Sequence, residues 1–126
     1  MVTINDIEGA KSEAIAILDE KIADAVSLRN SGSAKMEPII ARLMEQRTSM
    51  MVQAFSASLD VPTMMQALKA IKAATADMRI AAKNLISAQQ FIANVSRLET
   101  AANGVLGALA TSLPGEGGSR PIKPPT

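Results

Sequence analysis

Three acidic residues near the N-terminus are spaced so that their carboxylates could act together. Glu13, Glu20 and Asp24 follow one another at intervals of seven and four residues, which places them on one face of a helix. Such a group could bind a hard cation, but the segment has no glycine-turned loop of oxygen ligands, and the chain has no histidine for a Glu-x-x-His di-iron motif. We therefore interpret the group as a solvated acidic face and expect neither a metal ion nor a cofactor.

The chain has 126 residues and contains no Cys, His, Trp or Tyr. This composition excludes disulfides, thiolate and imidazole metal ligands, cysteine and tyrosine nucleophiles, and histidine proton relays. An enzyme that uses only carboxylates, lysines or serines remains an alternative. We expect a non-catalytic protein without a small-molecule substrate.

Four basic residues lie on neighbouring positions of one helical repeat: Lys69, Lys72, Arg79 and Lys83. Residues 1–24 carry six acids and two lysines, a local charge of −4. The favoured interpretation is that the two segments pair within one molecule, because opposite charges beside a helix seam select partner and orientation. The alternative is contact with an anionic membrane or nucleic acid, which the net charge of +1 and the 2% aromatic content disfavour.

A heptad pattern begins at Val61, and after Pro62 neither glycine nor proline interrupts it until Gly104. With Val61 as position a, the d positions include Ile71, Met78 and Leu85, and the g positions are Ala67, Ala74, Ala81 and Ala88. This column predicts a seam where a partner helix packs closely in a left-handed supercoil. The alternative is that alanine is simply frequent here.

A second apolar face is predicted opposite this seam. Ile80 and Phe91 occupy outer heptad positions, and Met50 and Met65 flank a predicted turn at Asp60. A helix that is apolar on two sides is either central in its bundle or paired with another molecule. The four residues are therefore candidates for a partner face, while core packing is the alternative, especially for the methionines.

The bounds of the predicted helices follow from helix-capping residues and from residues that interrupt helices. Asn5 with Glu8 is a capping box for a helix over residues 6–30, and Pro38 suits the first turn of a helix over 37–58. The third helix runs from Val61 until a break near Ser96, where a second capping box starts a short helix over 97–112. The expected inward stripe of the second helix consists of Ile40, Leu43, Met44, Met51, Ala54 and Phe55.

These elements predict an all-α antiparallel bundle of three long helices and one short C-terminal helix over residues 1–113. The segment 114–126 is rich in Gly and Pro and should form a flexible tail. No stretch is apolar enough to span a membrane, and the first residues lack the basic region of a cleavable signal. A soluble protein is expected, with the cytoplasm favoured and signal-less export left open.

The heptad, the alanine column and the second apolar face together favour a protein that works by helix packing. It would be a subunit of a homo-oligomer, or a small adaptor or inhibitor that docks on another protein. The alternative function is binding of an anionic surface through the four basic residues of the third helix.

Overall fold

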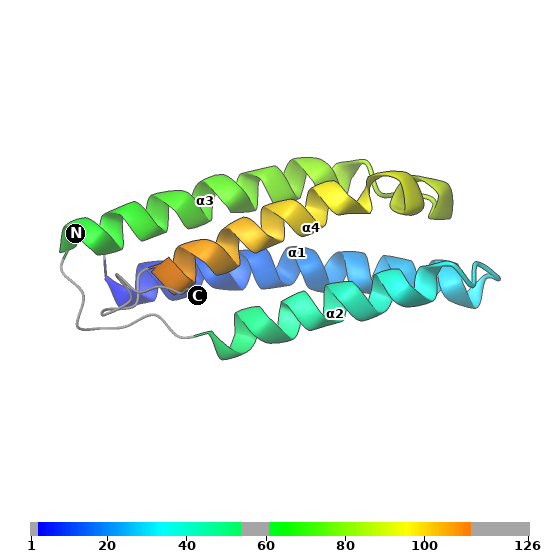
Figure 1. The fold of residues 1–126 in the computed structure, drawn as a ribbon, viewed down its shortest axis with the longest axis horizontal. Helices are drawn as coiled ribbons and strands as arrows, with labels where there is room; N and C mark the ends of the chain where they lie inside the picture. Colours follow the sequence, from blue (N-terminus) through cyan, green and yellow to red (C-terminus); the bar gives the residue numbers. More distant parts are fainter. Residues whose placement is uncertain (1–2, 54–60, 112–126) are drawn as a thin grey trace, which may run out of the picture.

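The computed structural model describes residues 3–53 and 61–111, which form a four-helix bundle (Figure 1). The helices are α1 (Ile4–Asn30), α2 (Met36–Val52), α3 (Val61–Lys83) and α4 (Ala88–Thr111). Their lengths run from 17 to 27 residues, so the expectation of three long helices and one short one is wrong. The predicted continuation of the second helix to residue 58 and the predicted tail lie outside the described residues.

The difference in helix length arises at the turn between α3 and α4. The Ser87 side chain accepts a hydrogen bond from the Gln90 backbone N–H (3.2 Å), and the Gln90 side chain accepts one from the Ser87 N–H (3.1 Å). This reciprocal capping starts a helix nine residues before the predicted start at Ser96. The predicted continuous helix through Ile92 is therefore wrong, and the predicted cap of Ser96 with Glu99 lies inside α4.

The first helix also begins earlier than predicted. Thr3, and not Asn5, is its N-cap, and Thr3 and Asp6 form the capping box. After α1, Gly32 adopts a φ of 116°, a left-handed conformation that side chains disfavour. Pro38 lies in the first turn of α2, as predicted.

Polar contacts between the helices define their relative directions. Contacts between α1 and α2 join Lys11 to Gln53, Asp19 to Arg47 and Arg29 to Glu37, so these helices run antiparallel. Glu13 of α1 contacts Arg79 of α3, and Lys21 further along α1 contacts Leu85 in the turn that follows α3, so α1 and α3 run parallel. Contacts between α2 and α4 join Arg42 to Glu99 and Gln46 to Asn103, also in parallel order.

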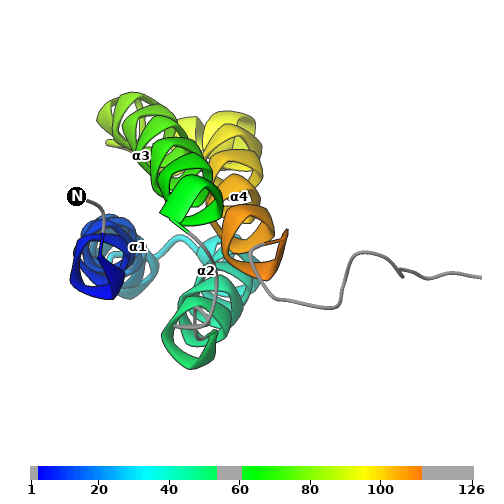
Figure 2. The same cartoon turned by 90° about the vertical axis from the view of Figure 1, so that its left-hand side faces the viewer.

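The bundle therefore consists of two antiparallel hairpins, α1–α2 and α3–α4, that lie side by side. Figure 2, a view along the bundle, shows α2 and α3 at opposite corners. The core between the two hairpins contains the following fully buried large side chains: Ile7, Leu18, Met36, Leu43, Met50, Ile71, Met78, Leu85, Phe91, Leu98, Val105 and Leu109.

Part of the predicted core stripe of α2 is exposed. Met44 and Met51 are 51% and 52% exposed, whereas Met36 and Met50 are buried. The reason is that α2 occupies a corner of the bundle and contacts only α1 and α4, which leaves it a narrow buried stripe. None of the helices in the described ranges is long and apolar enough to cross a membrane.

Candidate functional site

The predicted packing seam lies along the inner side of α3. Ile71, Met78 and Leu85 are fully buried, Ala67 and Ala81 are buried, and Ala74 and Ala88 are partly buried. The column does not continue along one helix, because Ala88 is the first residue of α4.

Ala74 marks a close approach between α3 and α4. A Cβ atom built on Gly104 would lie 3.1 Å from the Cβ of Ala74, closer than side chains normally come. Gly104 of α4 therefore lies at the level of Ala74 of α3 and allows the two helices to pack tightly.

The four residues predicted to form a partner face do not lie together. Ile80 and Met65 are 62% and 54% exposed, whereas Phe91 and Met50 are fully buried core residues. The break between α3 and α4 resets the helical phase, so Phe91 faces the core and not the side opposite the seam. Ile80 and Met65 are separated by 15 residues of α3, or about 22 Å along the helix.

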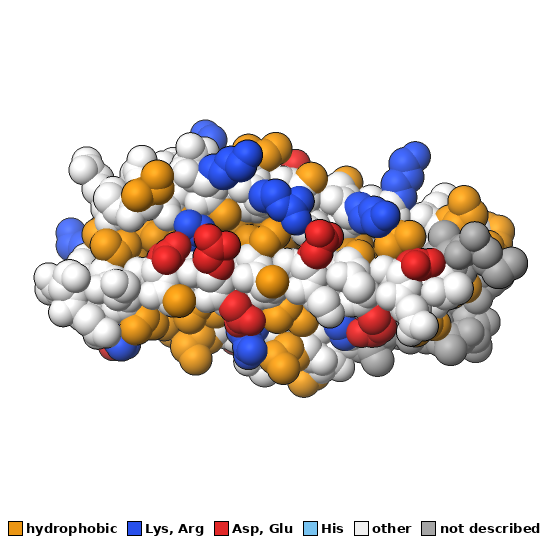
Figure 3. All heavy atoms as spheres, turned by 180° about the vertical axis from the view of Figure 1, so that it is seen from behind, with side chains coloured by type: hydrophobic (Ala, Val, Ile, Leu, Met, Phe, Trp, Pro, Cys, Tyr) orange, Lys and Arg blue, Asp and Glu red, His pale blue; other side chains and the backbone are white. Residues whose placement is uncertain are grey.

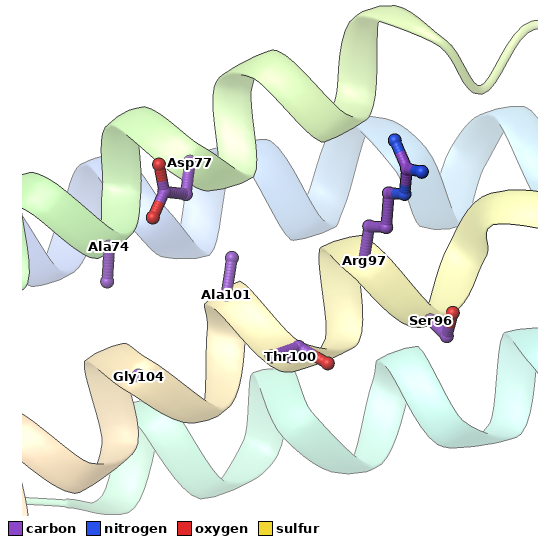
Figure 4. Close-up of a pocket in the computed structure, with 7 residues that line it drawn as sticks. All are labelled: Ala74, Asp77, Ser96, Arg97, Thr100, Ala101 and Gly104. Atoms are coloured by element: carbon purple, nitrogen blue, oxygen red, sulfur yellow. The ribbon is translucent and has the colours of Figure 1, made fainter.

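A groove lies on the surface between α3 and α4, and the sequence did not indicate it (Figure 4). Its volume is about 380 Å³, and its lining residues are Ala74, Asp77, Ser96, Arg97, Thr100, Ala101 and Gly104. Three of these lining residues, Ala74, Ala101 and Gly104, are alanine or glycine. The sequence placed the break between the two helices near Ser96, nine residues later than the structure does, so it gave no correct relation between Asp77 on α3 and Arg97 on α4.

The two charged residues of the groove come from different helices. Figure 4 shows Asp77 on α3 and Arg97 on α4. Within residues 3–53 and 61–111 neither side chain has an ion-pair partner within 4.0 Å. Ile80 lies three residues after Asp77, about one turn further along α3.

Two of the four predicted basic residues, Arg79 and Lys83, lie beside α1, where they line one pocket together with Glu20 and Lys21. Figure 3 shows a row of Lys and Arg side chains beside a row of Asp and Glu side chains. Arg79 contacts Glu13 at 3.4 Å, and both side chains are at least half exposed, which makes the pair weak. Lys69, Lys72 and Lys83 are exposed and form no ion pair with any described residue.

The three acidic residues that could have formed a cation site are separately engaged or exposed. Glu13 pairs with Arg79, Asp24 pairs with Lys21 at 3.0 Å, and Glu20 is exposed. Among the described residues no group of three or more acidic side chains is arranged to hold a metal ion.

No protein-family model matches this chain, and no curated protein or solved structure is similar enough to it to indicate a function.

Proposed function

We propose that the chain is a non-catalytic interaction protein that binds another protein surface by helix packing on the outer face of α3 and α4. The partner surface belongs either to a second copy, which makes the chain a self-assembling subunit, or to a foreign protein, which makes it a small adaptor or inhibitor. The observation that carries the proposal is the exposure of Ile80, which lies one turn along α3 from Asp77 of the α3–α4 groove.

Ile80 lies nine residues after the fully buried Ile71, which is two and a half helical turns. Its side chain therefore projects from the side of α3 opposite the core. Covering it would contribute on the order of 1 kcal/mol to an association. A lone exposed isoleucine is ordinary, but one beside a small-residue groove supplies both an apolar contact and room for a partner helix.

Within the described residues the groove holds no activated nucleophile, which favours a non-catalytic role. The groove contains the hydroxyl groups of Ser96 and Thr100, but in the described part of the chain neither is hydrogen-bonded to the Asp77 carboxylate. A serine or threonine hydroxyl needs an adjacent base to become a nucleophile. The chain has no histidine, the residue that most often takes that role.

The test is the absolute mass in solution, measured by light scattering over a wide range of protein concentrations. We expect the wild-type chain to associate and Ile80→Asp to remain monomeric, with the same helix content by circular dichroism. Met44→Asp is the matched control, because Met44 is similarly exposed but lies on α2. Equal association of both variants would contradict a role for this face.

If the wild-type chain is monomeric at every concentration, the foreign-partner form is tested by a photo-crosslinking residue at position 80. Discrete crosslinked products that are absent with the same residue at position 44 would support the proposal. Identical products from both positions would contradict it.

A second candidate function is binding of an anionic surface through Lys69, Lys72, Arg79 and Lys83. The observation that favours it is that three of the four basic side chains are exposed without an ion-pair partner among the described residues. We expect any such binding to vesicles rich in phosphatidylserine to fall steeply with added salt and with Lys69→Glu and Lys72→Glu. Binding that is insensitive to salt, or equal on neutral vesicles, would exclude this function.

A further inference from the structure

We infer that the occupant of the α3–α4 face is a second copy of this chain, packed antiparallel with a two-fold axis beside Ala73. This inference rests on the proposed function and specifies its partner. The charges and side-chain sizes on either side of Ala73 support it.

Lys69, Ala73 and Asp77 follow one another at intervals of four residues, so they share one exposed face of α3. Lys69 and Asp77 are eight residues apart, about 12 Å along the helix, which is too far for them to pair within one chain. Neither has an ion-pair partner elsewhere in the described residues.

An antiparallel copy centred on Ala73 provides an ion-pair partner for both Lys69 and Asp77. Reversing the direction of the second helix places its Asp77 opposite Lys69 and its Lys69 opposite Asp77, which gives two equivalent ion pairs. A parallel copy in register would instead place like charges opposite each other. The charge pattern of this face is therefore complementary to itself in one orientation.

The same register pairs the remaining residues of the face. Gln66 and Ile80 lie seven residues on either side of Ala73, so each Ile80 meets the Gln66 side chain of the other copy. Ala70 and Ala76 lie three residues on either side, and both are exposed. The centre of the contact thus contains only small side chains, which permits a short distance between the helices.

Gly107 provides an independent observation at the same level of the bundle. It is exposed in the interior of α4, one turn after Gly104, and a Cβ atom there would have no atom of the bundle within 4 Å. Glycine in a helix interior costs roughly 0.5–1 kcal/mol relative to alanine. Without a side chain, Gly107 lets the backbone of a second copy pack closely at this position of α4.

The resulting contact is isologous, since each copy uses the same residues, so it closes after two copies. The interface contains one large aliphatic side chain from each chain, and the ion pairs fix its register.

The experiment uses charge reversal in the full-length chain, with the dissociation constant measured by sedimentation. Lys69→Asp and Asp77→Lys should each weaken self-association by about tenfold or more, because two attractive pairs become two repulsive ones. An equimolar mixture of the two variants should form a 1:1 heterodimer, and the double variant should recover self-association. Lys72→Asp is the matched control, since it makes the same charge change at an exposed position outside this face.

A second measurement uses the absence of cysteine from the chain. Ala73→Cys places one thiol beside the proposed axis and should give a disulfide-linked dimer under mild oxidation. Lys72→Cys should give far less. Circular dichroism confirms that each variant retains its helix content.

Two results would overturn the inference. If the wild-type chain self-associates but Lys69→Asp behaves like Lys72→Asp, the copies meet through another register, and the proposed function survives if Ile80→Asp still abolishes association. If the wild-type chain is monomeric at all concentrations, the second copy is not the occupant, and only the foreign-partner form of the proposed function remains to be tested by crosslinking.

Discussion

The ammonium nitrogen of Lys21 donates a hydrogen bond to the backbone oxygen of Leu85, at 3.1 Å. Lys21 lies in α1 and is only 8% exposed, and Leu85 lies in the turn that follows α3. The carbonyl groups at the end of a helix have no partner within that helix and carry a partial negative charge. Lys11 makes the same contact with the Gln53 carbonyl oxygen at the end of α2, at 3.0 Å, so α1 caps two other helices.

Replacing Lys21 by methionine tests this cap. The variant keeps much of the side-chain volume but leaves the Leu85 carbonyl oxygen unpaired, so we expect the free energy of unfolding to fall by about 1–3 kcal/mol. Urea denaturation followed by circular dichroism measures the change. Lys72→Met is the control, because Lys72 is exposed, and it should change the value by less than about 0.5 kcal/mol. Equal effects of the two variants would show that the buried hydrogen bond does not stabilise the fold.

The start of α4 gives a second prediction. Ser87→Ala removes the side-chain oxygen that accepts from the Gln90 N–H, and we expect it to lower the free energy of unfolding by about 1 kcal/mol. Ser96→Ala is the matched control, because Ser96 is exposed inside α4, where alanine is the better helix former. A larger loss for Ser96→Ala would place the helix start at Ser96 and contradict the structure.

Local sequence signals were sufficient for much of the fold. The periodic apolar residues of 6–30, the turn around Gly32 and the first-turn position of Pro38 all predicted elements that the structure contains. The all-α class followed from the same signals. Each of these elements is specified by residues that are close together in the sequence. It can therefore be predicted from that segment alone.

The break between α3 and α4 could not be predicted in this way. Residues 84–87 contain no glycine or proline, and Leu85 fits the buried heptad position whether the helix continues or ends. The turn is held in part by Lys21, which is 64 residues away in the sequence. The misplaced break explains why the prediction missed the groove and assigned the buried Phe91 to a partner face.

Phe91 and Ile80 therefore give a third, contrasting prediction. Phe91→Ala would leave a cavity in the core, and we expect a loss of about 3–5 kcal/mol in the free energy of unfolding. Ile80→Ala should change it by less than about 0.5 kcal/mol, because the side chain is mostly exposed. Thermal and urea unfolding of the two variants measure both values in a Lys69→Asp background, so that self-association does not contribute to the apparent stability. Similar losses would show that Ile80 is a core residue, which would also remove the main support for the proposed function.

The two exposed glycines of α4 give a fourth prediction, because their surroundings differ. Gly107→Ala adds a methyl group in open space and should raise the free energy of unfolding of the monomer by about 0.5–1 kcal/mol.

Gly104→Ala gains the same helix preference but places its Cβ 3.1 Å from that of Ala74, so α3 and α4 must move apart slightly. We expect Gly104→Ala to be less stable than Gly107→Ala by about 1 kcal/mol. Unfolding should be measured in a Lys69→Asp background, so that self-association does not contribute to the apparent stability. If Gly104→Ala were the more stable variant, α3 and α4 would not pack closely at Ala74, and the level at which α4 meets the proposed second copy would have to be revised.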